Sequence, residues 1–122
     1  ASFTQKAAIE AITGSQKDSQ NMVEEFKNRR ELVVNGLNSI PGIRCATPKG
    51  AFYAFPNIQD TKMSSKKFAD DLLMEAGVAV LAGESFGKYG DGFIRISFAN
   101  STERLKEALK RISSFVTSRS ST

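Results

Sequence analysis

The chain has 122 residues, of which 40% are apolar, and this is enough to form one hydrophobic core. Its 17 lysines and arginines outnumber its 13 aspartates and glutamates, for a net charge of +4. The basic residues are scattered, so the sequence indicates neither nucleic-acid nor membrane binding. Histidine is absent and Cys45 is the only cysteine, which excludes histidine-based catalysis, a disulfide framework and a cysteine metal site. We expect Cys45 to be a small core residue.

The first forty residues predict two helices. The first covers residues 2–12, with apolar side chains along one side and Gly14 at its end. The second begins at Asp18 or Ser19 and ends at Ser39, before a Pro-Gly pair. Its apolar residues recur at helical spacing and its charged residues fill the other faces, where we expect them to be solvated. The apolar set is Met22, Phe26, Val33, Leu37 and Ile40.

The middle of the chain predicts two strands and a helix. Residues 43–46 form a brief strand, and a Pro-Lys-Gly turn leads into a stronger strand at 51–55. A loop at 57–63 follows. Ser64 is then placed to cap a helix that ends at Gly77.

The last part predicts two more strands and a final helix. A short apolar strand at 78–81 is followed by a glycine-rich loop at 82–92 and a strand at 93–98. The last helix begins at Asn100 or Ser101. The predicted fold is therefore an α+β two-layer sandwich, in which helices pack on one face of a small, mostly antiparallel sheet. We expect the other face to be open to a ligand or another domain.

Arg95 is the residue that most needs an explanation. In the strand at 93–98, Ile94, Ile96 and Phe98 alternate with Phe93, Arg95 and Ser97, so the two sets point to opposite faces. A guanidinium among apolar neighbours is costly unless an anion meets it, and its planar fork suits a carboxylate. The alternative is that Arg95 lies on a solvated face and has no function.

Three other patterns in the sequence do not indicate a function by themselves. The glycine loop at 83–88 has the wrong spacing for a phosphate-binding loop, and a strand follows it rather than a helix, which favours a flexible connection. In the aromatic strand, Tyr53 and Phe55 share a face as in RNA-recognition modules, but Ala51 breaks the alternation. The acidic pairs Glu24-Glu25 and Asp70-Asp71 lie on helices and diverge, so we expect them to be solvated.

Six short stretches of this sequence together resemble a known family. They are Ser2–Ala8, Phe26–Glu31, Pro48–Tyr53, Gly77–Val80, Gly83–Gly87 and Phe93–Ala99. In this order and spacing, from about Phe3 to Ile112, they are similar to the C-terminal part of class I (fold type I) pyridoxal-phosphate aminotransferases of the aspartate aminotransferase group.

The resemblance implies a role for particular residues. Arg95 would hold the α-carboxylate of the substrate, and Phe52, Tyr53 and Phe86 are candidates for the lining of the pocket. The intact enzyme would use pyridoxal 5'-phosphate to move an amino group between an aspartate-like amino acid and a 2-oxo acid. It would be a cytoplasmic homodimer, with neither nucleic acid nor membrane as a partner.

The resemblance also implies that the chain is a fragment. The family's cofactor-binding lysine, in a Ser-Lys motif, and the large domain's other cofactor contacts have no counterpart here. We therefore expect residues 1–14 to be a remnant of the large domain, residues 15–116 to be the small domain, and residues 117–122 to be a frayed tail. The chain alone would contain no catalytic residue and bind no cofactor. The alternative is a free-standing regulatory module that binds an amino acid through Arg95.

Overall fold

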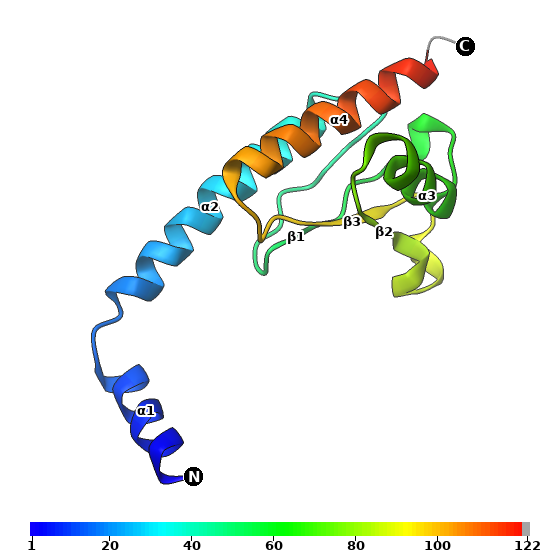
Figure 1. Cartoon of the computed structure of the whole chain (residues 1–122). Helices are drawn as coiled ribbons and strands as arrows, with labels where there is room; N and C mark the ends of the chain where they lie inside the picture. Colours follow the sequence, from blue (N-terminus) through cyan, green and yellow to red (C-terminus); the bar gives the residue numbers. More distant parts are fainter. Residues whose placement is uncertain (121–122) are drawn as a thin grey trace.

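The computed structural model of the protein describes residues 1–120, with four α-helices and three short strands in that range (Figure 1). The helices are α1 (Ser2–Thr13), α2 (Lys17–Asn38), α3 (Ser65–Ala76) and α4 (Thr102–Ser120). The strands are β1 (Tyr53–Ala54), β2 (Leu81–Ala82) and β3 (Ile94–Ser97). Within this range no helix is both long and apolar enough to cross a bilayer.

The sheet has the order β1-β3-β2, and both pairings are antiparallel. Tyr53 of β1 lies opposite Ser97 of β3, and Leu81 of β2 lies opposite Arg95. The strand that carries Arg95 is therefore the central one. The predicted α+β architecture with a small antiparallel sheet is confirmed.

The core lies between one face of this sheet and the helices. Ile94 and Phe98 point into it and are 0% and 1% exposed. They belong to one apolar cluster with buried residues of α2 and α4. Helices α2 and α4 run side by side (Figure 1) and approach closely at Gly36, where a Cβ atom would lie 2.5 Å from Leu109 Cδ1. The predicted alternation of β3 is confirmed, because Ile94 is buried while Ser97, on the other face, is exposed.

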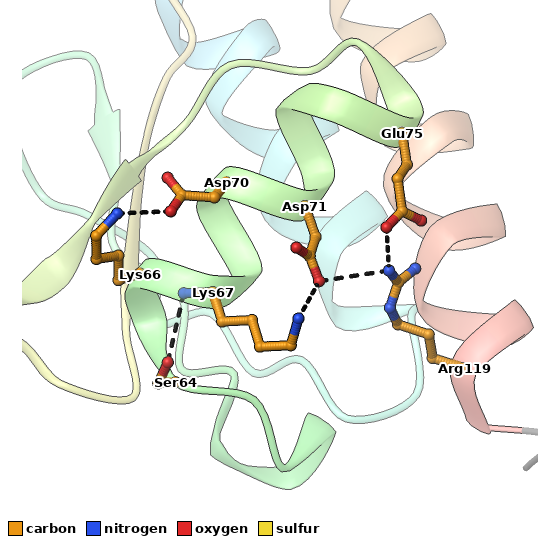
Figure 2. A network of polar contacts seen from close by, with 7 residues as sticks. All are labelled: Ser64, Lys66, Lys67, Asp70, Asp71, Glu75 and Arg119. Atoms are coloured by element: carbon orange, nitrogen blue, oxygen red, sulfur yellow. Dashed lines mark hydrogen bonds and ion pairs between the residues drawn. The ribbon is translucent and has the colours of Figure 1, made fainter.

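Helix α3 is joined to α4 by apolar and ionic contacts. The Phe68 and Phe115 rings meet edge to face with centroids 5.4 Å apart. Figure 2 shows the ionic part, in which Arg119 of α4 contacts Glu75 at 2.5 Å and Asp71 at 3.4 Å. Hydrogen bonding to Lys67, followed by the nearby positive charges, lowers the pKa of Asp71. These contacts fix α3 against the end of α4.

Helix α1 covers nothing in the rest of the chain. No residue of α1 is buried, and Figure 1 shows it separate from the body of the molecule. Its apolar side chains are left uncovered, with Phe3, Ile9 and Ile12 at 78%, 61% and 80% exposed. The predicted helix forms, but its apolar side has no partner within the described residues.

The strands are shorter than the sequence predicts. The strand expected at 43–46 is reduced to a single bridge between Arg44 and Asn57. The strand expected at 51–55 is limited to Tyr53–Ala54, because Ala51 has a left-handed backbone with φ of 57°. Of the strand expected at 78–81, only Leu81 joins the sheet. At its start, the Val78 N–H still bonds to the carbonyl of Leu72 in α3.

The two ends of α4 are defined by local contacts. Ser101 Oγ accepts a hydrogen bond from the Arg104 N–H, so Ser101 rather than Asn100 caps the helix. The tail expected to fray at 117–122 is helical through Ser120, because Phe115 and Val116 are buried and Arg119 is paired with α3. Residues 121–122 of that expected tail lie outside the described residues.

Candidate functional site

The side chain of Arg95 lies between two aromatic rings. Its guanidinium carbon is 4.4 Å from the centre of the Tyr53 ring and 4.0 Å from the centre of the Phe86 ring. Tyr53 is brought there by the pairing of β1 with β3, and Phe86 by the short helical turn η2 (Gly83–Phe86). Strand pairing and a loop therefore each supply one wall of the site.

The charge of Arg95 is not neutralised inside the described chain. Its guanidinium forms no ion pair or hydrogen bond with any of residues 1–120, although its side chain is half-buried. Aromatic rings attract a cation through their faces, whereas the N–H donors of a guanidinium point outward in its plane. The two rings therefore hold the side chain while its N–H donors stay available for an anion.

A small hollow adjoins Arg95. Its volume is about 150 Å³, and Arg95 is the only charged residue that lines it. Its other walls are small and apolar side chains with one phenol and one hydroxyl: Tyr53, Ala79, Val80, Leu81 and Ser97. A site with one cation, no acidic side chain and apolar walls suits a small anion such as a carboxylate.

Two further rings support Phe86. Phe55 stacks on Phe93 with centroids 5.3 Å apart and planes 8° apart, and it meets the edge of Phe86 at 6.3 Å. Phe55 and Phe93 are not among the residues predicted for the site from the sequence. The available signal was the alternation of side chains, because Phe93 shares the face of Arg95 and Phe55 shares that of Tyr53.

Phe52 lies elsewhere. Its ring packs against Phe26 of α2 at 6.0 Å and lines a separate apolar groove of about 530 Å³ with Met22, Val23 and Phe98. Of the three aromatic residues proposed to line the pocket, Tyr53 and Phe86 contact Arg95. Phe52 reaches this site only through the ring of Tyr53, at 4.6 Å.

The surroundings of Arg95 do not form a cofactor site. A ring cofactor with an aldehyde and a phosphate needs an amine, a phosphate-binding group and a space larger than this hollow, whose lining contains neither lysine nor acid. Within residues 1–120 there is also no cluster of three or more potential metal ligands. The arrangement can bind and orient an anion.

The sequence was compared with known protein families. The sequence model described as "Aminotransferase class I and II" matches residues 1–112. The chain belongs to this family. The resemblance found in the six sequence stretches is thereby confirmed.

Individual aminotransferases are similar over nearly the whole chain. An aspartate aminotransferase of Pyrococcus horikoshii is 49% identical over 92% of this chain and 29% of its own length. A probable N-acetyl-LL-diaminopimelate aminotransferase of Bacillus subtilis is 44% identical over 94% of this chain and 29% of its own.

Solved structures give the same result. The aromatic aminotransferase of Pyrococcus horikoshii superposes with a TM-score of 0.92, at 43% identity, over 97% of this chain and 32% of its own. The aspartate aminotransferase of Rhizobium meliloti gives a TM-score of 0.89 at 38% identity over 96% of this chain and 31% of its own. The chain thus spans about three tenths of the length of these relatives.

Proposed function

We propose that this chain is the small C-terminal domain of a pyridoxal-phosphate-dependent aminotransferase, in which Arg95 binds the α-carboxylate of the substrate. The observation that carries the proposal is the environment of Arg95 on the central strand. Its side chain lies between two rings, has no counterion within residues 1–120, and lines a small hollow. Family membership and the coverage of the relatives support it.

The names of the relatives favour the α-carboxylate over a side-chain carboxylate. They refer to aspartate, to a diaminopimelate derivative and to aromatic amino acids, at 43–49% identity to this chain. These substrates differ in their side chains and share the α-carboxylate. Arg95 lies in the segment that is similar in all of these relatives. The shared α-carboxylate, present in both the amino acid and the 2-oxo acid, is therefore the group that it is best suited to bind.

In the proposed enzyme, this chain binds and orients substrate and excludes water. When bound by the rest of the protein, pyridoxal phosphate supplies the chemistry at the amino group. The Arg95 fork holds the carboxylate through two parallel hydrogen bonds, and the rings of Tyr53 and Phe86 keep solvent from its faces. Closure of this domain over the larger one brings Arg95 onto the substrate.

The uncovered apolar surfaces fit this assembly. We assign residues 1–14 to the large domain, whose packing would cover Phe3, Ile9 and Ile12 of α1. The proposed enzyme is a homodimer. A cytoplasmic location is consistent with a single cysteine that is buried as a free thiol.

The test is an Arg95→Lys variant of the full-length protein. Lysine keeps the charge but loses the two-point fork, so we expect kcat/KM to fall by about 10- to 100-fold for both amino acid and 2-oxo acid. The matched control is Arg44→Lys, at an exposed arginine whose charge is paired with Asp60. Kinetics that are unchanged in Arg95→Lys would overturn the assignment.

A further inference from the structure

Ser65 is a buried polar residue whose hydroxyl bonds to a distant loop. It is 0% exposed, and its Oγ accepts hydrogen bonds from the backbone N–H groups of Gly92 at 2.7 Å and Phe93 at 3.1 Å. Its own O–H faces the Gly90 carbonyl and the Asp91 carboxylate, each at 3.4 Å. One buried hydroxyl therefore contacts four consecutive residues just before β3.

The neighbouring serine has a different role. Ser64 Oγ accepts the Lys67 N–H and caps α3, as is typical of a serine at a helix start. Ser65 is the first residue of α3, and its hydroxyl is not used by the helix. Ser64 therefore bonds to the helix and Ser65 to the loop. A substitution of Ser64 is thus a matched control for the same substitution of Ser65.

The loop that Ser65 contacts closes on itself. We call residues 83–93 the Phe86 loop; its two ends meet where the Gly83 N–H bonds to the Phe93 carbonyl at 2.8 Å. A Cβ atom on Gly83 or on Gly90 would overlap the backbone of the other residue, so neither position has room for a side chain. Between these ends the loop forms two short helical turns, Gly83–Phe86 and Lys88–Gly90.

We propose that Ser65 is a positioning residue, whose hydroxyl holds the Phe86 loop in the conformation that places the Phe86 ring against Arg95. Two connections join Ser65 to the guanidinium. Phe93, whose backbone Ser65 holds, lies just before β3 and precedes Arg95 by two residues, so the two side chains point to the same face of the sheet. The Phe93 ring also stacks on Phe55, which contacts the edge of Phe86.

Removing the hydroxyl affects one side of Arg95 only. In Ser65→Ala the Phe93 N–H keeps only the Gly90 carbonyl, at 3.1 Å, and the Gly92 N–H keeps only the Asp91 carboxylate. The loop loses its hydrogen bonds to α3 and is held less tightly, and Phe86 moves with it. Tyr53 stays in place, because the pairing of β1 with β3 holds it independently of the loop. The consequence for substrate rests on the function proposed above for Arg95.

The first experiment needs no substrate, and its first measurement needs no substitution. Hydrogen exchange resolved to single residues is measured on the full-length protein, and we expect the amides of Gly92 and Phe93 to exchange as slowly as that of Ile94 in β3. In Ser65→Ala, exchange across 83–93 accelerates while Tyr53 and Ala54 are unchanged. In Ser64→Ala, acceleration is limited to the first turn of α3. Fast exchange at Gly92 and Phe93 in the unmodified protein would overturn the proposal even if Ser65→Ala fails to fold.

The second experiment asks whether Ser65 acts through Phe86. Ser65→Ala and Phe86→Ala are each expected to raise KM by about two- to fivefold, the value of one partly exposed cation–π contact. If Ser65 acts through the ring, the double variant matches Phe86→Ala alone, and Ser64→Ala leaves KM unchanged. If the effects of the two substitutions on KM multiply in the double variant, the role of Ser65 is merely structural, and the proposal is overturned.

The two experiments separate this inference from the proposed function. If exchange across the Phe86 loop accelerates in Ser65→Ala while KM for every carboxylate substrate is unchanged, the hydroxyl holds the loop as proposed. In that case the step from the Phe86 ring to substrate binding fails, and Arg95→Lys decides separately whether Arg95 binds the substrate.

Discussion

The guanidinium carbon of Arg95 lies 4.0 Å from the ring centre of Phe86, which belongs to a loop rather than to the sheet. On its other face the guanidinium meets Tyr53, which the strand pairing fixes. The two rings are thus held by independent elements, and substitutions can remove one without disturbing the other. This separation makes the site testable residue by residue.

The ring of Phe86 should contribute to ligand binding more than to stability. Its side chain is 48% exposed, so we expect Phe86→Ala to leave the free energy of unfolding nearly unchanged and to weaken binding of an amino-acid ligand by about two- to fivefold. Tyr89→Ala is the control, because Tyr89 lies on the same loop, is 85% exposed and contacts Lys88 instead. Equal losses in the two variants, measured by calorimetric titration, would contradict this interpretation.

The contact between α3 and α4 should dominate the stability of that part of the domain. Phe68 is 0% exposed and packs against Phe115, so we expect Phe68→Ala to lower the free energy of unfolding by about 3–5 kcal/mol. Met74 lies on the same helix at 83% exposed, and Met74→Ala should change it by less than about 0.5 kcal/mol. Urea unfolding monitored by circular dichroism measures both, and similar values for the two variants would refute the packing account.

The ion pairs of Figure 2 predict a loss of stability in acid. Hydrogen bonding to Lys67 lowers the pKa of Asp71 below its ordinary value of 3.8, so the unfolded chain binds its proton more readily than the folded one. The contribution of Asp71 is therefore fully present above pH 3.8 and is lost as pH falls through the lower, folded pKa.

Asp71→Asn tests this dependence. We expect the variant to be less stable than the unmodified chain at neutral pH, and the difference to shrink as the pH is lowered below about 4. Unfolding in urea at a series of pH values measures the difference, with Asp18→Asn, at an exposed position in the first turn of α2, as control. A difference between Asp71→Asn and the unmodified chain that does not vary with pH would contradict the assignment.

Cys45 should be unreactive in the folded protein. It is 7% exposed, and burial raises the pKa of its thiol, which reduces the thiolate available as a nucleophile. We expect alkylation by iodoacetamide to be slow at neutral pH and to become fast in urea. A Ser15→Cys variant, with a second thiol at an exposed position, should react rapidly at the new site under both conditions. Rapid native labelling of Cys45 would indicate that this part of the core opens.

The helices could be predicted from the sequence because their ends are marked. Ser64 caps α3 and Gly77 ends it with a left-handed backbone, φ 66°, both as the sequence indicates. The strands were predicted too long for a physical reason. Residues such as Ile43 and Cys45 are buried by the helices, and apolar side chains read as a strand whether or not the backbone finds a partner.

The site was predictable to the extent that it follows from strand alternation. Successive side chains of a strand point to opposite faces, so the sequence predicts that Arg95 points away from the face of Ile94. The contact between Arg95 and Tyr53 then follows from the pairing of β1 with β3. The path of the Phe86 loop could not be derived, because it depends on the hydroxyl of Ser65 reaching a segment far along the chain. The sequence marks Ser64 as a helix cap, but nothing in it indicates that Ser65 contacts a loop.

The most direct measurement of the central claim pairs a change in the ligand with a change in the protein. Binding of an amino acid, and of the amine that lacks only its α-carboxylate, is measured for the full-length protein and for Arg95→Gln. We predict that the unmodified protein prefers the amino acid by about 10- to 100-fold, and that Arg95→Gln binds the two ligands with similar affinity. If Arg95→Gln keeps the full preference for the carboxylate, then Arg95 does not bind it and the account is contradicted.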